Sequence, residues 1–136
     1  MRVSFLLAVV LFSAVPISLA EVLITEFMAS NQDALLDGDG DSSDWLEIFN
    51  SGTTAVDLGG HFLTDDAAEP QKWVFPQHSL APNGFVLVFA SGKNRATAGS
   101  EMHTNFSLAS SGDYLALVAP DGVTILSEFR FSQQYD

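Results

Sequence analysis

Carboxylate side chains crowd one short stretch of this sequence. Four aspartates lie within eight residues and alternate with glycine and serine: Asp37, Asp39, Asp41 and Asp44. Such a loop can fold its oxygens around Ca²⁺, which takes about six to eight oxygen ligands. It is not an EF-hand, because Ser42 replaces the glycine and Ile48 the closing glutamate of that motif. We predict a Ca²⁺ site with these four aspartates as ligands; the alternative is a solvated turn held by side-chain to backbone hydrogen bonds.

The other polar residues give weaker indications of chemistry. His61, His78 and His103 match no zinc-binding spacing. A Ser-His-Asp triad is available by composition, but the sequence contains no Gly-x-Ser-x-Gly turn. The acidic residues near Asp65 could serve a glycosidase, although a small domain leaves little room for a substrate cleft. We therefore predict no catalytic residue and no enzymatic activity.

Two tryptophans raise carbohydrate binding as an alternative function. Trp45 and Trp73 could stack on sugar rings, but both have apolar neighbours within expected strands. Packing in the core is therefore favoured for each. An exposed, coplanar aromatic pair on one sheet would favour a carbohydrate-binding module of a secreted hydrolase. Histidines and carboxylates converging in a pocket would favour a metal-dependent hydrolase.

The apolar pattern predicts that strands position all of these residues. Apolar residues recur at every second position or in short runs, with turn residues between them. Seven strands are expected, at residues 22–28, 45–49, 61–64, 72–75, 85–89, 114–118 and 123–129. No stretch shows helical periodicity. The predicted fold class is all-β, an immunoglobulin-like sandwich of two sheets.

Three of these segments carry more specific expectations. Residues 72–75 lie between two prolines, which indicates an edge strand. Residues 85–89 are apolar throughout, so we expect both faces of this strand to be covered and Leu87 to lie in the core. The tripeptide at residues 120–122, Pro-Asp-Gly, predicts a hairpin turn.

The first twenty residues have the features of a cleavable signal peptide. A positive start at Arg2 precedes an apolar run over residues 3–15, and small residues at Ser18 and Ala20 suit a cleavage site. The run is short for about 30 Å of hydrocarbon, and Pro16 ends it. We predict cleavage after Ala20, a domain over residues 21–136, a secreted or cell-surface location and no membrane insertion after cleavage.

Charge and cysteine content exclude several classes of function. The chain has 17 acidic and five basic residues, with a formal net charge of −12. Such a surface repels the phosphates of nucleic acids and anionic membranes, so we expect no direct nucleic-acid binding. The absence of cysteine excludes disulfide bonds and favours a bacterial source over an animal secreted one.

Several ordered blocks resemble the lamin tail domain family in its bacterial, secreted form. Residues 24–31 look like its opening strand, and residues 44–50 (DWLEIFN) resemble its "DWIEIYN" signature. Residues 56–66 are similar to its "V-L-G-W-L-T-D" pattern. Further similar blocks follow in order at residues 72–76, 80–84, 103–106 and 112–117.

The resemblance covers nearly all of residues 22–131 and implies an immunoglobulin-like sandwich without catalytic residues. It implies an exported interaction or spacer module, an accessory domain of a larger surface or secreted protein. The expected partner is a protein or a cell-surface glycan. Residues 129–136 resemble the point where relatives continue, so we expect this domain to be part of a longer protein.

Overall fold

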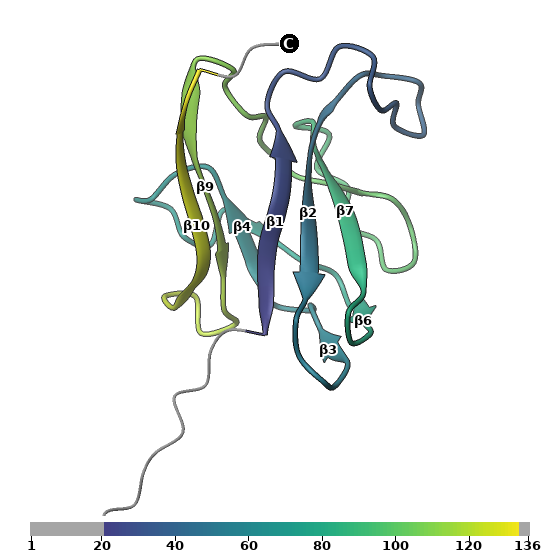
Figure 1. Cartoon of the computed structure of the whole chain (residues 1–136), viewed down its shortest axis with the longest axis vertical. Coiled ribbons are helices and arrows are strands. Elements are labelled where there is room, and N and C mark those ends of the chain that lie inside the picture. The colour runs from purple at the N-terminus through teal and green to yellow at the C-terminus, as the bar shows by residue number, and fades with distance from the viewer. Residues whose placement is uncertain (1–20, 134–136) are drawn as a thin grey trace, which may run out of the picture.

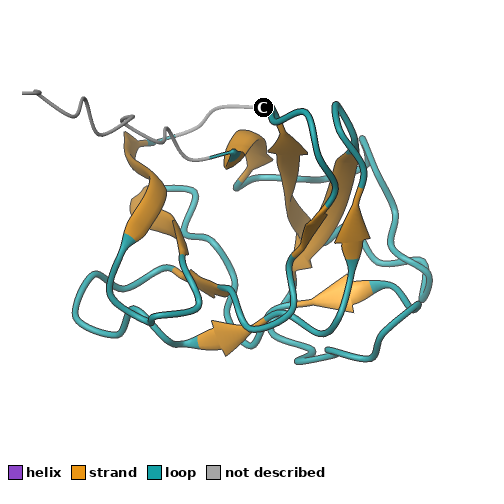
Figure 2. Ribbon diagram, turned by 90° about the horizontal axis from the view of Figure 1, so that it is seen from below, coloured by secondary structure: helices purple, strands orange, loops and turns teal. Residues whose placement is uncertain are grey.

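The computed structural model describes residues 21–133 and forms strands and loops without a helix in that part of the chain (Figure 2). These residues therefore contain no helix long and apolar enough to cross a membrane. The predicted signal peptide lies outside the described residues. The strands, in chain order, are β1 (Val22–Met28), β2 (Asp44–Asn50), β3 (Val56–Asp57), β4 (Phe62–Thr64), β5 (Trp73–Val74), β6 (Ser79–Leu80), β7 (Phe85–Ala90), β8 (Met102–His103), β9 (Gly112–Val118) and β10 (Ile125–Ser132).

Two four-stranded sheets pack face to face as a sandwich (Figure 1). The first sheet has the order β1-β2-β7-β8, antiparallel except for the parallel pair β7 and β8. The second sheet has the order β10-β9-β4-β5 and is antiparallel throughout. The short strands β3 and β6 form a separate ribbon. The predicted immunoglobulin-like sandwich is confirmed.

The core lies between the two sheets, and every second residue of each long strand points into it. Leu46, Ile48 and Val88 of the first sheet are fully buried, as are Leu63, Leu115 and Leu117 of the second. Successive side chains of a strand point to opposite faces. The residues between these positions consequently lie on the outer faces of the sandwich.

Two local predictions are confirmed. Trp73 and Val74 form β5 at the edge of the second sheet, between the two prolines. The turn at residues 120–122 connects β9 to β10, with a hydrogen bond of 2.9 Å from Gly122 N to the carbonyl oxygen of Ala119. Gly122 has φ +75°, a conformation that glycine adopts without steric cost.

The expectation that β7 is covered on both faces is wrong for its first half. Phe85 is 57% exposed, whereas Val88, Phe89 and Ala90 are buried. Leu87 pairs with Glu47 on the outer face and is half-buried, so the core residue is its neighbour Val88. When every residue of a strand is apolar, the sequence does not indicate whether the odd or the even positions face the core. The outer face of β7 is covered only at the end of the strand near Ala90.

Candidate functional site

The aspartate loop (residues 37–41) folds around the side chain of Asp37. Asp37 Oδ1 accepts hydrogen bonds from the backbone N–H groups of Asp39 and Asp41, at 3.0 and 3.1 Å. Its other oxygen, Oδ2, accepts one from Ser43 Oγ at 2.8 Å. Gly40 closes the turn with φ +88°, and its N–H donates to the carbonyl of Asp37. The carboxylate of Asp37 is buried and forms the centre of the loop.

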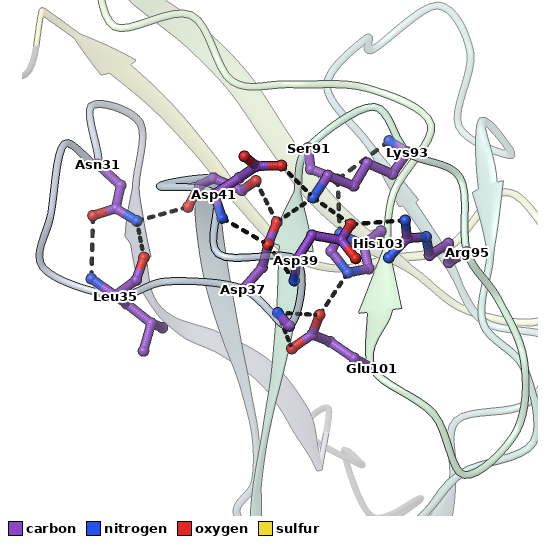
Figure 3. A network of polar contacts seen from close by, with 12 residues as sticks. Asn31, Leu35, Asp37, Asp39, Asp41, Ser91, Lys93, Arg95, Glu101 and His103 are labelled. Atoms are coloured by element: carbon purple, nitrogen blue, oxygen red, sulfur yellow. Dashed lines mark hydrogen bonds and ion pairs between the residues drawn. The ribbon is translucent and has the colours of Figure 1, made fainter.

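A lysine from a distant part of the chain joins the three loop carboxylates (Figure 3). Lys93 Nζ lies 2.6 Å from Asp37 Oδ2, 2.8 Å from Asp39 Oδ2 and 2.9 Å from Asp41 Oδ2. Arg95 adds a second cation, with Nη2 2.7 Å from Asp39 Oδ2. An ammonium group thus takes the place among the carboxylates where the sequence predicts Ca²⁺.

These ion pairs shift the protonation equilibria of their members. Burial raises the pKa of Asp37, but the bonds from Lys93, Ser43 and the backbone outweigh it and hold that pKa well below its ordinary value. Hydrogen bonds from Arg95 and Lys93 lower the pKa of Asp39 to about 2. The neighbouring carboxylates raise the pKa of Lys93. The carboxylates of Asp37 and Asp39 and the ammonium of Lys93 are therefore all charged at neutral pH.

A buried histidine connects the same loop to the first sheet. Gly38 N–H donates to Glu101 Oε1 at 2.9 Å, and Glu101 Oε1 lies 2.8 Å from His103 Nε2. His103 Nδ1 lies 2.8 Å from Ser91 Oγ, and its ring stacks on Phe89 with centroids 5.3 Å apart. Because a carboxylate only accepts hydrogen bonds, Nε2 carries the proton in the neutral ring and Nδ1 accepts from Ser91.

Glu101, His103 and Ser91 have the residue types of a nucleophilic triad. The burial of His103 and the hydrogen bonds of Glu101 and Ser91 to the backbone indicate that they stabilise the fold instead. The imidazole is fully buried, and Ser91 Oγ also accepts the backbone N–H of Lys93 at 3.2 Å. Glu101, His103 and Ser91 do not line either of the following two cavities in the described part of the chain. One, of about 480 Å³, is lined by residues 69–72 and Asn105. The other, of about 180 Å³, is lined by Met28, Ser30 and residues 32–34.

Asp44, the fourth predicted ligand, lies apart from the other three. Asp37, Asp39 and Asp41 bring carboxylate oxygens within 4.8 Å of one another, and Asp44 is not in that group. Its Oδ1 accepts the backbone N–H of Asn31 at 3.2 Å. Burial raises the pKa of Asp44, against the hydrogen bonds from the backbone of Asn31 and Leu108. The structure thus brings together three of the four predicted ligands.

Sequence reasoning missed the residues that hold the loop from outside it. Lys93, Arg95 and Glu101 lie more than fifty residues away along the chain. Asn31 secures the preceding segment, since its Nδ2 donates to the carbonyls of Leu35 and Ser43 at 2.6 and 2.8 Å. A signal for two of them was present: Lys93 and Arg95 are two of the four basic residues after residue 20.

The histidines and tryptophans lie in separate environments. Within residues 21–133, the metal-ligating groups that cluster are the three aspartates, and no histidine joins them. His61 Nδ1 lies 3.1 Å from the carbonyl of Leu58, and burial lowers the pKa of His61. Trp73 is buried with its ring edge-on to Phe75, at 5.0 Å between centroids. Trp45 is half-buried opposite Phe89.

Apolar side chains remain exposed on both outer faces of the sandwich. On the first sheet, Phe49 and Phe85 stack with centroids 4.5 Å apart at an interplanar angle of 29°. On the second sheet, directly paired positions form a cross-strand row of Val74, Phe62, Val118 and Ile125. Val74 and Ile125, at the two ends of the row, are 48% and 41% exposed.

A family model described as the Lamin Tail Domain matches residues 16–130 of this chain. A comparison with curated proteins gives no match. The family match spans all of the strands from β1 to β9 and most of β10.

Proposed function

Since the chain belongs to the lamin tail domain family, we propose that it is an exported, non-enzymatic module that binds a protein partner. The family and the immunoglobulin-like fold support an interaction domain. Export is supported by the apolar start of the sequence and its small residues before Glu21. In this proposal the module is an accessory or spacing domain of a larger surface or secreted protein.

One observation carries the non-enzymatic part of the proposal. The densest group of reactive side chains, Asp37, Asp39, Asp41, Lys93 and His103, is satisfied by internal ion pairs and hydrogen bonds. A catalytic group needs a substrate within hydrogen-bond reach and a place for that substrate. These side chains instead hold the aspartate loop and the residues after β7 against the first sheet, which is a structural role.

The cross-strand row supports a protein as the partner. Val74 and Ile125 present exposed aliphatic side chains at the two ends of this row, whereas Phe62 is half-buried and Val118 is fully buried between them. Exposed apolar patches on soluble proteins mark interaction sites. Aliphatic residues bury apolar surface of a protein partner but offer neither the ring faces nor the hydrogen bonds that sugars need.

Photo-cross-linking of the exported chain tests this proposal. A photoreactive residue in place of Val74 or Ile125 should give a covalent product with a protein, identified by mass spectrometry. The same residue in place of Thr53, which is exposed on the loop after β2, is the control. Cross-links at the two row positions but not at the control support the proposal. Equal products at all three positions, or none, would contradict it.

The exposed phenylalanine pair favours carbohydrate binding as a second candidate. Phe85 is 57% exposed on the outer face of the first sheet. However, Phe49 and Phe85 stack on each other, so one face of each ring is covered, whereas a sugar platform presents rings side by side. Co-sedimentation with insoluble polysaccharides decides: we expect no binding, and binding that is lost in Phe85→Ala would establish the second candidate.

A further inference from the structure

The two sheets have four edge strands, and these edges differ in length and regularity. β5 and β8 have two residues each, and Arg95 forms a bridge with His103 on the free side of β8. β1 is interrupted by a bulge between Ile24 and Glu26, near its middle. β10 has eight residues, and its bulge lies at its start, between Ile125 and Ser127. The segment 127–132 is therefore the longest regular edge in the described part of the chain.

This segment has the properties of a template for another strand. An edge strand presents unpaired N–H and C=O groups along its free side. Natural edges are shortened, bulged or covered to prevent pairing, as β1, β5 and β8 are. No described strand pairs with β10 on the side opposite β9. Glu128, Phe129 and Arg130 in its middle are all exposed.

The side chains of β10 alternate between the two faces of the second sheet. Phe129 and Phe131 face the first sheet, with ring centroids 5.5 and 4.7 Å from that of Phe27. Glu128 and Arg130 lie on the outer face, where Tyr114 donates to Glu128 Oε2 at 2.8 Å. The Arg130 guanidinium lies 4.6 Å from the Tyr114 ring centroid. Opposite charges thus flank Phe129 symmetrically on one face.

We propose that β10 pairs antiparallel with β10 of a second copy of this chain, about a two-fold axis at Phe129. This register places Glu128 of each copy opposite Arg130 of the other, and Ser127 opposite Phe131. Opposite charges at directly paired positions stabilise a ladder, and like charges destabilise it. An axis at Glu128 or Arg130 would place two identical charges opposite each other. Several positions of the two-fold axis would keep the outer faces of the two sheets on the same side. Among them, only the axis at Phe129 pairs Glu128 with Arg130.

The resulting dimer joins the second sheets of two copies into one continuous sheet. Such an interface is isologous, since the same residues serve on both sides. This inference deepens the proposed function and rests on it, because it names a second copy as one partner of the module. Val74 of the cross-strand row lies in β5, at the edge of the second sheet opposite β10, so binding through Val74 and pairing through β10 are measured separately.

Reversal of the two charges, singly and together, tests the register. The exported chain is compared by sedimentation equilibrium at about 0.15 M salt, where long-range repulsion between acidic chains is screened. Wild type should approach twice the monomer mass as its concentration rises. Glu128→Arg or Arg130→Glu alone should weaken dimerisation about tenfold, since each places like charges opposite in two symmetric pairs. The double variant Glu128→Arg with Arg130→Glu should restore it.

Glu69→Arg is the matched control, because Glu69 is exposed in the segment between β4 and β5 and its reversal changes the net charge as Glu128→Arg does. A monomeric wild type, or single reversals that dimerise as well as wild type, would overturn the proposal. A monomeric chain that still cross-links to another protein through Val74 would overturn the self-pairing alone and leave the proposed function in place.

A cysteine at the axis gives a second readout that does not depend on charge. The chain contains no cysteine, so a disulfide-linked dimer of a single-cysteine variant can form only through the introduced position. Residues directly opposite each other in an antiparallel pair have Cα atoms about 4.5–5.5 Å apart, within the range of a disulfide. Phe129→Cys should oxidise to a covalent dimer, whereas Val123→Cys, 71% exposed in the hairpin turn, should not. Equal oxidation of both variants would contradict the axis.

Discussion

Lys93 is the side chain on which the aspartate loop depends most. Its ammonium contacts three carboxylates, whereas the Arg95 guanidinium contacts only that of Asp39. Asp37 is buried, and a buried charge that loses its partner is costly. We expect Lys93→Met to lower the thermal midpoint of unfolding more than Arg95→Met does, although both remove one positive charge. Equal losses in the two variants, measured by circular dichroism, would show that general charge balance is responsible.

The Ca²⁺ site remains a prediction. The position of Lys93 among the carboxylates shows which variant tests it best. Ca²⁺ has to displace this ammonium to reach Asp37, Asp39 and Asp41, because all three carboxylates already bind it. We expect millimolar Ca²⁺ to raise the unfolding midpoint of Lys93→Met clearly and that of wild type little, at fixed ionic strength.

Two comparisons separate Ca²⁺ binding from general charge effects. Mg²⁺ should do less than Ca²⁺ because it resists dehydration and requires a tighter octahedron. Asp39→Asn with Asp41→Asn in the Lys93→Met background should abolish the shift. A chain in which Ca²⁺ stabilises neither form would leave the loop as a turn held by its lysine.

Stability should also depend on pH through the same carboxylates. Hydrogen bonds from Arg95 and Lys93 lower the folded-state pKa of Asp39 to about 2, from an ordinary value of 3.8. A depressed folded-state pKa stabilises the protein above the unfolded-state pKa, and this stabilisation is lost as the pH falls through the folded-state value. Wild type should therefore lose stability between about pH 4 and pH 2. Lys93→Met should lose less there, as measured by urea midpoints.

The sequence predicted part of this site because the contributing residues are close in the chain. Asp37, Asp39 and Asp41 share one tight turn, so their spacing alone brings them together. Asp44 separates from them because β2 begins at that residue and carries it away from the turn. Lys93 and Glu101 reach the loop only through the pairing of β7 and β8, which spacing along the sequence does not reveal.

Core and outer-face positions of one sheet should respond differently to the same substitution. Leu46 in β2 is fully buried between the sheets, whereas Leu87 in β7 is half-buried on the outer face opposite Glu47. Leu46→Ala should cost about 2–5 kcal/mol, since it leaves a cavity. Leu87→Ala should cost no more than about 1 kcal/mol, because less area is removed from contact. Similar unfolding free energies for both variants would contradict the assigned faces of β7.

The longer strands and β5 were predictable, and the other short strands were not. Each of the seven expected segments overlaps a strand of the structure, because an apolar pattern over several residues is specific to a sheet with a buried face. β3, β6 and β8 have two residues each, and their pairing depends on tertiary contacts. The face of β7 was also not predictable, since an apolar residue at every position carries no period.

The whole sequence consists of an apolar N-terminal segment followed by an acidic domain without cysteine, so the domain folds without a disulfide bond. Residues 21–133 enclose a core of aliphatic and aromatic side chains between two sheets, and Phe62, Tyr114, Ala116 and Val118 form a second, smaller apolar cluster. The charged residues lie mostly outside this core, and the densest cluster of them is paired with Lys93 and Arg95. Because the chain has no cysteine, its fold does not depend on disulfide formation, which is consistent with the export proposed above.

The central claim is that this module acts after export, and the N-terminus of the natural protein tests it most directly. N-terminal sequencing of the protein from its host should find Glu21 as the first residue, followed by Val22, Leu23 and Ile24, since cleavage is predicted after Ala20. The same protein should be recovered from the medium or the cell surface. A protein that retains Met1 and is recovered from the cytosol would contradict the account.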